Sequence, residues 1–261
     1  DWSITDFTVA ELKQWIGGTT YDARNERPSA LNGKYPILTM QEIIDIAKAK
    51  SASTGRTITV YPEAKNPYWN NAQAMANGCG TGTHPFEDAI VKLIKDNNLN
   101  SKTAPIFVQS FDPASLKYMR SIGLNTRVVQ LIDGNDVNYK TGEMIYQTND
   151  EYNFVDGRPY SWTLNGDGRY FGAMLTPAGL AEIKTYADGI GPWKPYLLKT
   201  LAGKAGVPKE IRDRLQNHAL QDVSSKHYDR WNYMVEKRAG MAKWDKFVRA
   251  MLAKKRLKAA A

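Results

Sequence analysis

The sequence has 261 residues, of which 42% are hydrophobic and 24% charged, and its formal net charge is +8. These values exclude a disordered chain and a collagen-like repeat, while the single cysteine, Cys79, excludes an internal disulfide and a cysteine-cluster zinc site. No apolar run approaches the roughly 20 residues that a membrane-spanning helix needs.

Two predicted helices near the amino end share one start signal. Thr8 with Glu11, and Thr39 with Glu42, have the spacing of a capping box, in which each side chain bonds the backbone N–H of the other residue. Apolar residues follow each pair at helical spacing. They are Val9, Leu12, Trp15 and Ile16 in the first helix, and Ile43, Ile44, Ile46 and Ala47 in the second.

Beyond these helices the chain alternates predicted strands and helices. β-Branched and aromatic runs predict strands over residues 57–61, 105–111 and 127–132, and residues 187–191 are expected to form the edge of a fourth strand. Helices are predicted over residues 87–97, from Asp112-Pro113, and from Thr176-Pro177 to about Tyr186. This alternation, with strands apolar on both faces, predicts a parallel sheet, and both a β/α barrel and a doubly wound sheet fit it. Residues 133–175 show little periodicity, which is typical of a functional or partly disordered loop.

Charged and polar residues follow the predicted strands. Glu63 and Lys65 come directly after the first strand, and Gln109 and Phe111 end the second. Active sites of parallel α/β folds lie at the carboxyl ends of the strands, so these residues are expected on one rim. The alternative is that Glu63 and Lys65 form a strand-end ion pair of little energetic worth.

The segment Tyr61-Pro-Glu-Ala-Lys-Asn-Pro67 resembles the strand-end motif of the glycerophosphodiester phosphodiesterases, which usually have Ile in place of Ala64. Other pieces follow in that family's order over about residues 1–198: Asp6-Phe7-Thr8 with Glu11-Leu12, Val108–Phe111, Val129–Ile132 and Ala187–Pro192. The resemblance implies a β/α barrel that hydrolyses glycerophosphodiesters to glycerol 3-phosphate and an alcohol with bound Ca²⁺ or Mg²⁺. It also implies that Glu63 is a metal ligand, that Lys65 is a cation near the phosphate, and that Gln109 and Phe111 line the substrate pocket.

Several motifs of that family do not occur in this sequence. They are a His-Arg-Gly strand, a strand with two acidic metal ligands, a His-Asp pair and the last barrel strand. An incomplete, truncated TIM-type barrel that is inactive on its own is therefore expected, and its open sheet edges predict oligomers or aggregation. His84 is expected to cap a helix or to be solvated. No leader is apparent, so the expected location is periplasmic or secreted if the family leader is restored and cytoplasmic otherwise.

The net positive charge of the protein comes from the end of the chain. Residues 1–198 have 19 Lys and Arg against 21 Asp and Glu, whereas residues 199–261 have 16 against 6. We therefore expect two segments, a phosphodiesterase-like partial barrel over 1–198 and a short basic helical tail over 199–261. A solvated basic helix is the plain alternative for the tail.

The tail resembles the carboxyl end of a phage-type tyrosine recombinase, an integrase. The resemblance rests on the run from Lys199 to His218, then Tyr228-Asp-Arg230, Glu236-Lys-Arg238 and Met241-Ala-Lys-Trp244. It implies that His218 assists at the scissile phosphate and that Tyr228 is the nucleophile. The recombinase arginines and first histidine do not occur upstream, which favours Tyr228 as a surface or packing aromatic and leaves weak DNA binding through charge. The second functional hypothesis is accordingly a DNA-binding or recombinase-derived protein that acts through its tail.

Overall fold

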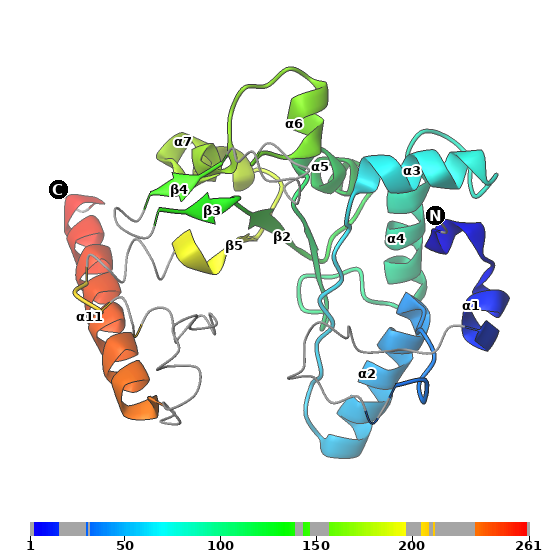
Figure 1. Cartoon of the computed structure of the whole chain (residues 1–261), viewed down its shortest axis with the longest axis horizontal. Helices are drawn as coiled ribbons and strands as arrows, with labels where there is room; N and C mark the ends of the chain where they lie inside the picture. Colours follow the sequence, from blue (N-terminus) through cyan, green and yellow to red (C-terminus); the bar gives the residue numbers. More distant parts are fainter. Residues whose placement is uncertain are drawn as a thin grey trace, which may run out of the picture. The chain divides into compact units, whose positions relative to one another are not determined.

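The computed structural model describes residues 3–15, 30, 32–138, 143–146, 157–196, 205–208, 211 and 233–259. Helices and short strands alternate along this part of the chain (Figure 1). It divides into two units, residues 1–110 with 114–129 and residues 111–113 with 130–261. Among the described residues, no helix combines the length and apolarity needed to cross a bilayer.

The amino-terminal helices begin where the capping boxes predict. A short 3-10 helix, η1 (Ile4–Asp6), precedes α1 (Val9–Trp15) and α2 (Met40–Thr54). Thr8 donates its backbone N–H to Glu11 at 2.7 Å, and Thr39 donates its N–H to Glu42 at 2.7 Å. Both reciprocal bonds are formed in each case, which confirms the two predicted helix starts. Lys13 forms an ion pair with Glu42 and so joins α1 to the start of α2.

The central sheet is parallel. Its three strands have the order β1 (Phe107–Ser110), β2 (Arg127–Ile132) and β5 (Gly189–Pro192). Thr126 Oγ1 donates to the carbonyl of Ile106 at 3.2 Å, so β1 and β2 start side by side. The N–H of Trp193 donates to Ile132 O at 2.7 Å, so β2 and β5 end side by side. These three strands confirm three of the four predicted runs.

The fourth predicted run, residues 57–61, is not a regular strand. It pairs with the β1 side of the sheet at two parallel bridges, Val60↔Ile106 and Glu63↔Gln109. Four backbone hydrogen bonds of 2.8–3.1 Å form the ladder: Val60 N to Pro105 O, Phe107 N to Val60 O, Gln109 N to Pro62 O and Ala64 N to Gln109 O. A regular ladder also needs a bond from the N–H of residue 62, and Pro62 has none. The prediction was therefore right about parallel pairing within the sheet and wrong about a regular strand over residues 57–61.

Three helices of the first unit share a buried polar contact. α3 (Pro67–Ala76), which the sequence patterns did not reveal, lies beside α4 (Pro85–Asp96), and α5 (Pro113–Ser121) follows β1. Glu87 is 1% exposed, and its carboxylate accepts from Asn71 Nδ2 at 2.7 Å and from Ser115 Oγ at 2.8 Å. α4 thus supplies a buried carboxylate, and α3 and α5 each supply one hydrogen-bond donor to it.

Apolar side chains close the interior around the strands. β1 and β2 bury alternate residues, so one face of each strand is covered more completely than the other. The most completely buried apolar side chains come from the strands and the chain next to them and from α2, α4 and α5: Ile44, Ile94, Ile106, Val108, Leu116, Met119, Leu124, Val128 and Ile132.

The second unit places short elements in the predicted long loop. β3 (Asp136–Val137) and β4 (Met144–Ile145) pair antiparallel, with Asp136 opposite Ile145. α6 (Tyr160–Leu164), η2 (Phe171–Leu175) and α7 (Pro177–Ile183) follow, and Thr176 caps α7 as its sequence predicts. Residues 139–142 and 147–156 of the predicted loop lie outside the described residues.

One long helix, α11 (Met234–Ala259), is described in the predicted tail. Tyr233 and Trp244 pack against a buried pair formed by Val207 and Ile211. His218 and Tyr228 lie outside the described residues. The described fold is therefore mixed α/β with a parallel sheet, whereas barrel closure and the domain boundary at residue 198 stay predictions.

We expect Asn71→Ala to lower the free energy of unfolding by about 2 kcal/mol, because the buried Glu87 carboxylate loses a hydrogen-bond donor. Urea denaturation followed by circular dichroism measures the change. Gln73→Ala on the same helix is the matched control and should stay within about 0.5 kcal/mol of the parent. Equal effects of the two substitutions would contradict the role assigned to Asn71.

Candidate functional site

The candidate site begins where the segment 60–64 runs beside the end of β1. Glu63 and Gln109 stand opposite each other at the second parallel bridge. The backbone bonds from Gln109 N to Pro62 O, 3.0 Å, and from Ala64 N to Gln109 O, 2.8 Å, flank this pair. The structure therefore brings together two of the predicted site residues, from positions 46 residues apart in the sequence.

Side chains fix the chain on both sides of Glu63. The amide of Gln109 donates to Tyr61 O at 3.1 Å, and the buried hydroxyl of Ser110 donates to Ala64 O at 2.7 Å. These bonds come from adjacent residues of β1 and hold the carbonyl groups before and after Glu63. The backbone that carries Glu63 is thus bonded to β1 through side chains as well as through the ladder.

Lys65 lies at the turn that joins the segment to α3. Its side chain is exposed, and its carbonyl accepts from Asn70 Nδ2 at 2.7 Å. The next residue, Asn66, has the left-handed backbone angles φ 44° and ψ 56°, a conformation that asparagine tolerates better than most residues. This turn ends the extended segment abruptly and starts α3 at Pro67.

Glu63 has a polar atom without a partner. Its Oε1 is buried and makes no hydrogen bond. No ion pair joins Glu63 to Lys65 among the described residues, so the strand-end ion pair offered as an alternative does not form there. A buried carboxylate oxygen with no donor is costly unless a proton or a cation compensates it.

The donor chemistry of Glu63 fits a hard divalent cation, which binds carboxylate oxygens. A metal site also needs further ligands beside Glu63. Among the described residues, no group of three or more His, Cys, Asp or Glu side chains could hold a metal ion. Glu63 can therefore supply one ligand, and the described part of the chain does not supply a full site.

Phe111 belongs to the second unit, which has its own polar cluster. The ring of Phe111 meets Phe171 edge-on, with centroids 6.0 Å apart. Its carbonyl accepts from Gln130 Nε2 at 2.9 Å, and Gln130 Oε1 accepts from the hydroxyl of Tyr186 at 2.9 Å. Burial raises the pKa of Tyr186 well above its usual value, so the hydroxyl stays protonated as a donor.

Sequence reasoning placed Gln130 on a strand but missed this cluster. Gln130 is fully buried, and Asp112, 6% exposed, accepts from the N–H of Ser161 at 3.0 Å. The available signal was a glutamine within the otherwise apolar run 127–132, because a buried amide needs partners.

His84 occupies the N-cap position of α4, but its side chain forms no capping bond. The imidazole instead stacks on Tyr118, with ring centroids 3.9 Å apart, and Nδ1 lies 2.7 Å from Thr83 Oγ1. The prediction thus placed His84 correctly at the start of a helix, but the side chain neither caps the helix nor lacks protein contacts. Aromatic stacking rather than capping holds the ring.

Comparison with known proteins shows similarity to glycerophosphodiester phosphodiesterases. No protein-family model matches the chain. It is 30% identical to glycerophosphodiester phosphodiesterase GDPD6 of Arabidopsis thaliana over 224 residues, which are 83% of this chain and 50% of the relative. It is 24% identical to the glycerophosphodiester phosphodiesterase of Haemophilus influenzae over 72% of this chain and 48% of the relative. The enzyme of that name from Treponema pallidum is 22% identical over 84% of this chain and 57% of the relative.

Proteins of one name thus cover most of the chain, which confirms the resemblance drawn from residues 1–198. The chain spans about half the length of the curated relatives that it matches. None of these relatives is a recombinase, and the integrase-like character of the tail stays a prediction.

We expect Glu63→Met to raise the free energy of unfolding by about 1 kcal/mol when no metal is present, because it removes a buried carboxylate oxygen that has no donor. Chemical denaturation in the presence of a chelator measures this. Lys65→Met, at an exposed position, is the control and should change stability by less than about 0.5 kcal/mol. A marked loss of stability in Glu63→Met would show that the carboxylate is satisfied in the folded chain.

Proposed function

We propose that this chain forms part of a metal-dependent hydrolase that cleaves glycerophosphodiesters to glycerol 3-phosphate and an alcohol. Similarity to three glycerophosphodiester phosphodiesterases over most of the chain is the observation that carries the proposal. The position of Glu63 beside Gln109, with an unpartnered buried oxygen, supports it independently.

In this proposal, Glu63 is one ligand of a Ca²⁺ or Mg²⁺ ion. Such an ion polarises a nonbridging phosphate oxygen when it is bound. The ladder to β1 and the Ser110 bond to Ala64 O hold the Glu63 backbone in place before any ligand arrives. This prior fixation lowers the entropy cost of placing the carboxylate against a cation.

Lys65 and Gln109 are assigned to substrate binding. The exposed ammonium group of Lys65 can approach a phosphodiester, whose single negative charge it would attract. Gln109 already donates its amide N–H to Tyr61 O, which fixes the orientation of its side chain. Phe111 is proposed as a further pocket residue on the strength of the family resemblance.

The 261-residue chain alone is expected to release no detectable glycerol 3-phosphate from glycerophosphocholine, with either Ca²⁺ or Mg²⁺ present. Its described residues hold one carboxylate of the proposed site and no complete ligand set. A coupled assay for glycerol 3-phosphate measures this. Robust, metal-dependent release by the purified chain would contradict the incomplete site.

The function itself is tested by reading the genomic DNA upstream of Asp1 and expressing any longer open frame. In an active longer protein, Glu63→Gln should lower kcat/KM by about 100-fold or more, because a metal ligand is lost. Glu182→Gln, on α7, is the control and should retain activity. Equal activity of Glu63→Gln and parent would remove Glu63 from the site.

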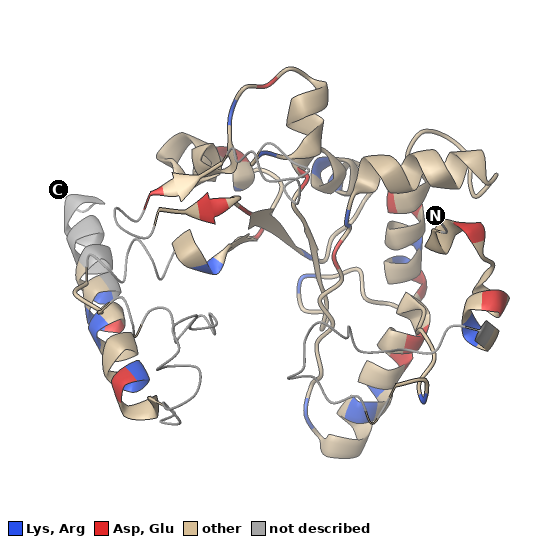
Figure 2. Ribbon diagram, viewed as in Figure 1, with Lys and Arg blue, Asp and Glu red and all other residues tan. Residues whose placement is uncertain are grey.

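We also propose that the tail binds the backbone of DNA weakly through charge. α11 has nine Lys and Arg against two acidic residues. Figure 2 shows basic residues in blue along the first part of α11, the part that the picture colours. Regularly spaced cations attract phosphates without reading base sequence, and this attraction weakens as salt rises.

We expect a shift of duplex DNA in a gel at about 50 mM salt and its loss at about 200 mM, because released counterions drive the association. The double variant Lys243→Glu with Lys246→Glu should abolish the low-salt shift. Lys48→Glu with Lys50→Glu, on α2, changes the net charge equally and should retain it. No shift of the parent at low salt would dismiss DNA binding.

A further inference from the structure

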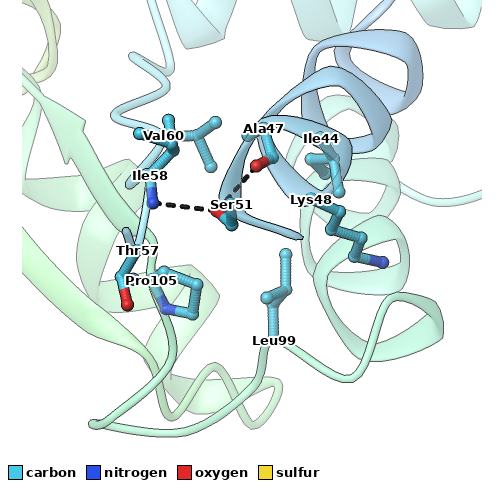
Figure 3. A pocket seen from close by; sticks show the side chains of 9 residues that line it. All are labelled: Ile44, Ala47, Lys48, Ser51, Thr57, Ile58, Val60, Leu99 and Pro105. Carbon is cyan, nitrogen blue, oxygen red and sulfur yellow. Dashed lines mark hydrogen bonds between the residues drawn. The ribbon is translucent and has the colours of Figure 1, made fainter. Parts of the chain in front are cut away.

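A cavity in the first unit lies at the opposite end of the extended segment from Glu63. It has a volume of about 230 Å³ and is formed between α2, the segment 57–60, and the chain just before β1. Its apolar lining comes from both sides of the space, as Figure 3 shows. The apolar lining residues are Ile44, Ala47, Ile58, Val60, Leu99 and Pro105.

Two of the polar groups at this cavity, the Ser51 hydroxyl and the backbone N–H of Val60, are already bonded to the protein. Ser51 Oγ accepts from the N–H of Ile58 at 2.9 Å and donates to Ala47 O at 2.7 Å, and both bonds are drawn in Figure 3. The backbone N–H of Val60 is used by Pro105 O at 3.0 Å. The cavity therefore presents few free polar groups, and an apolar group entering it would break none of these bonds.

A lysine completes the lining. Lys48 Nζ lies 2.8 Å from Asn97 Oδ1 and 3.5 Å from Asn97 O, both neutral acceptors. The carboxylate one turn earlier on α2, Asp45, accepts from Gln41 instead, and no carboxylate pairs with Lys48 among the described residues. An ammonium group has three donors, so Lys48 can still bond an anion.

We propose that this cavity binds a small amphiphile whose alkyl chain fills the apolar space and whose anionic head group bonds Lys48. The volume equals that of roughly eight water molecules at about 30 Å³ each, which is below the usual size of a pocket for a drug-sized ligand. A single short alkyl chain suits it better than a ring system or a diacyl lipid. The head group is a carboxylate or a phosphate monoester, since either accepts from an ammonium group.

This site is separate from the proposed phosphodiesterase site. Thr57 and Ile58 line the cavity at the start of the extended segment, whereas Glu63 stands at its end. Binding of an amphiphile here does not depend on a metal or on hydrolysis. Either proposal can fail while the other holds.

Isothermal titration of the 261-residue chain with octanoate, octyl phosphate and octan-1-ol tests the proposal. Saturable binding of octanoate or octyl phosphate is expected, with octan-1-ol weaker by about fivefold, because it has no charge for Lys48. The stronger of the two anions identifies the head group. Absence of saturable binding by all three compounds would overturn the proposal.

Variants then separate the charge from the cavity. Lys48→Gln should lower the affinity for the stronger-binding anion by about fivefold and keep the affinity for octan-1-ol within about twofold. Lys50→Gln, on the same helix, should change neither affinity. Ala47→Leu, which fills the space, should abolish binding of all three compounds. If Ala47→Leu fails to fold, judged by circular dichroism, the Lys48 and Lys50 pair still decides: equal affinities in both would overturn the site.

Discussion

The parallel contact between residues 60–64 and β1 is the constraint on which the first unit depends. It joins segments that the sequence separates by about forty residues, and it does so with only four backbone hydrogen bonds. Side chains compensate for the short ladder, since Ser110 and Gln109 each bond a carbonyl of the partner segment. The two ends of this contact then acquire different surroundings, a carboxylate at one end and an apolar cavity at the other.

Buried polar groups set the positions of the helices around that contact. Glu87 joins α3, α4 and α5 through Asn71 and Ser115, and no Lys or Arg forms an ion pair with it among the described residues. The first turn of a helix favours a carboxylate, and Glu87 stands in the first turn of α4. Because a buried carboxylate tolerates few alternative arrangements of its donors, this contact favours one packing of the three helices over others.

Local signals in the sequence predicted the elements that local chemistry decides. The capping boxes at Thr8 and Thr39 and the apolar run 127–132 each depend on residues close in the chain, and the structure has all three. The sequence also shows Pro62, but whether a proline interrupts a ladder depends on whether the neighbouring strand needs a bond from that backbone N–H. The sequence pattern did not predict α3. Its large apolar residues Tyr68, Trp69 and Met75 are exposed, so they do not form the apolar stripe at helical spacing that indicates a helix with one buried face.

The candidate site was predictable only in part for the same reason. Glu63, Lys65 and Gln109 were found from their places after strands and from a family resemblance, and the bridge between Glu63 and Gln109 agrees with that placement. The Gln130–Tyr186 bond and the stacking of His84 on Tyr118 join residues from distant parts of the chain. No spacing rule within one sequence specifies such pairs.

The left-handed backbone at Asn66 restricts how this region can vary during evolution. Only glycine, asparagine and aspartate adopt such angles at small cost, whereas a β-branched residue would strain the turn. We therefore expect the strand-end motif and α3 to vary together, since a substitution that the turn does not tolerate would move the start of the helix as well as the chain after Glu63. In related sequences, the residue at this position would distinguish those that keep α3 in this orientation from those that have rebuilt the turn.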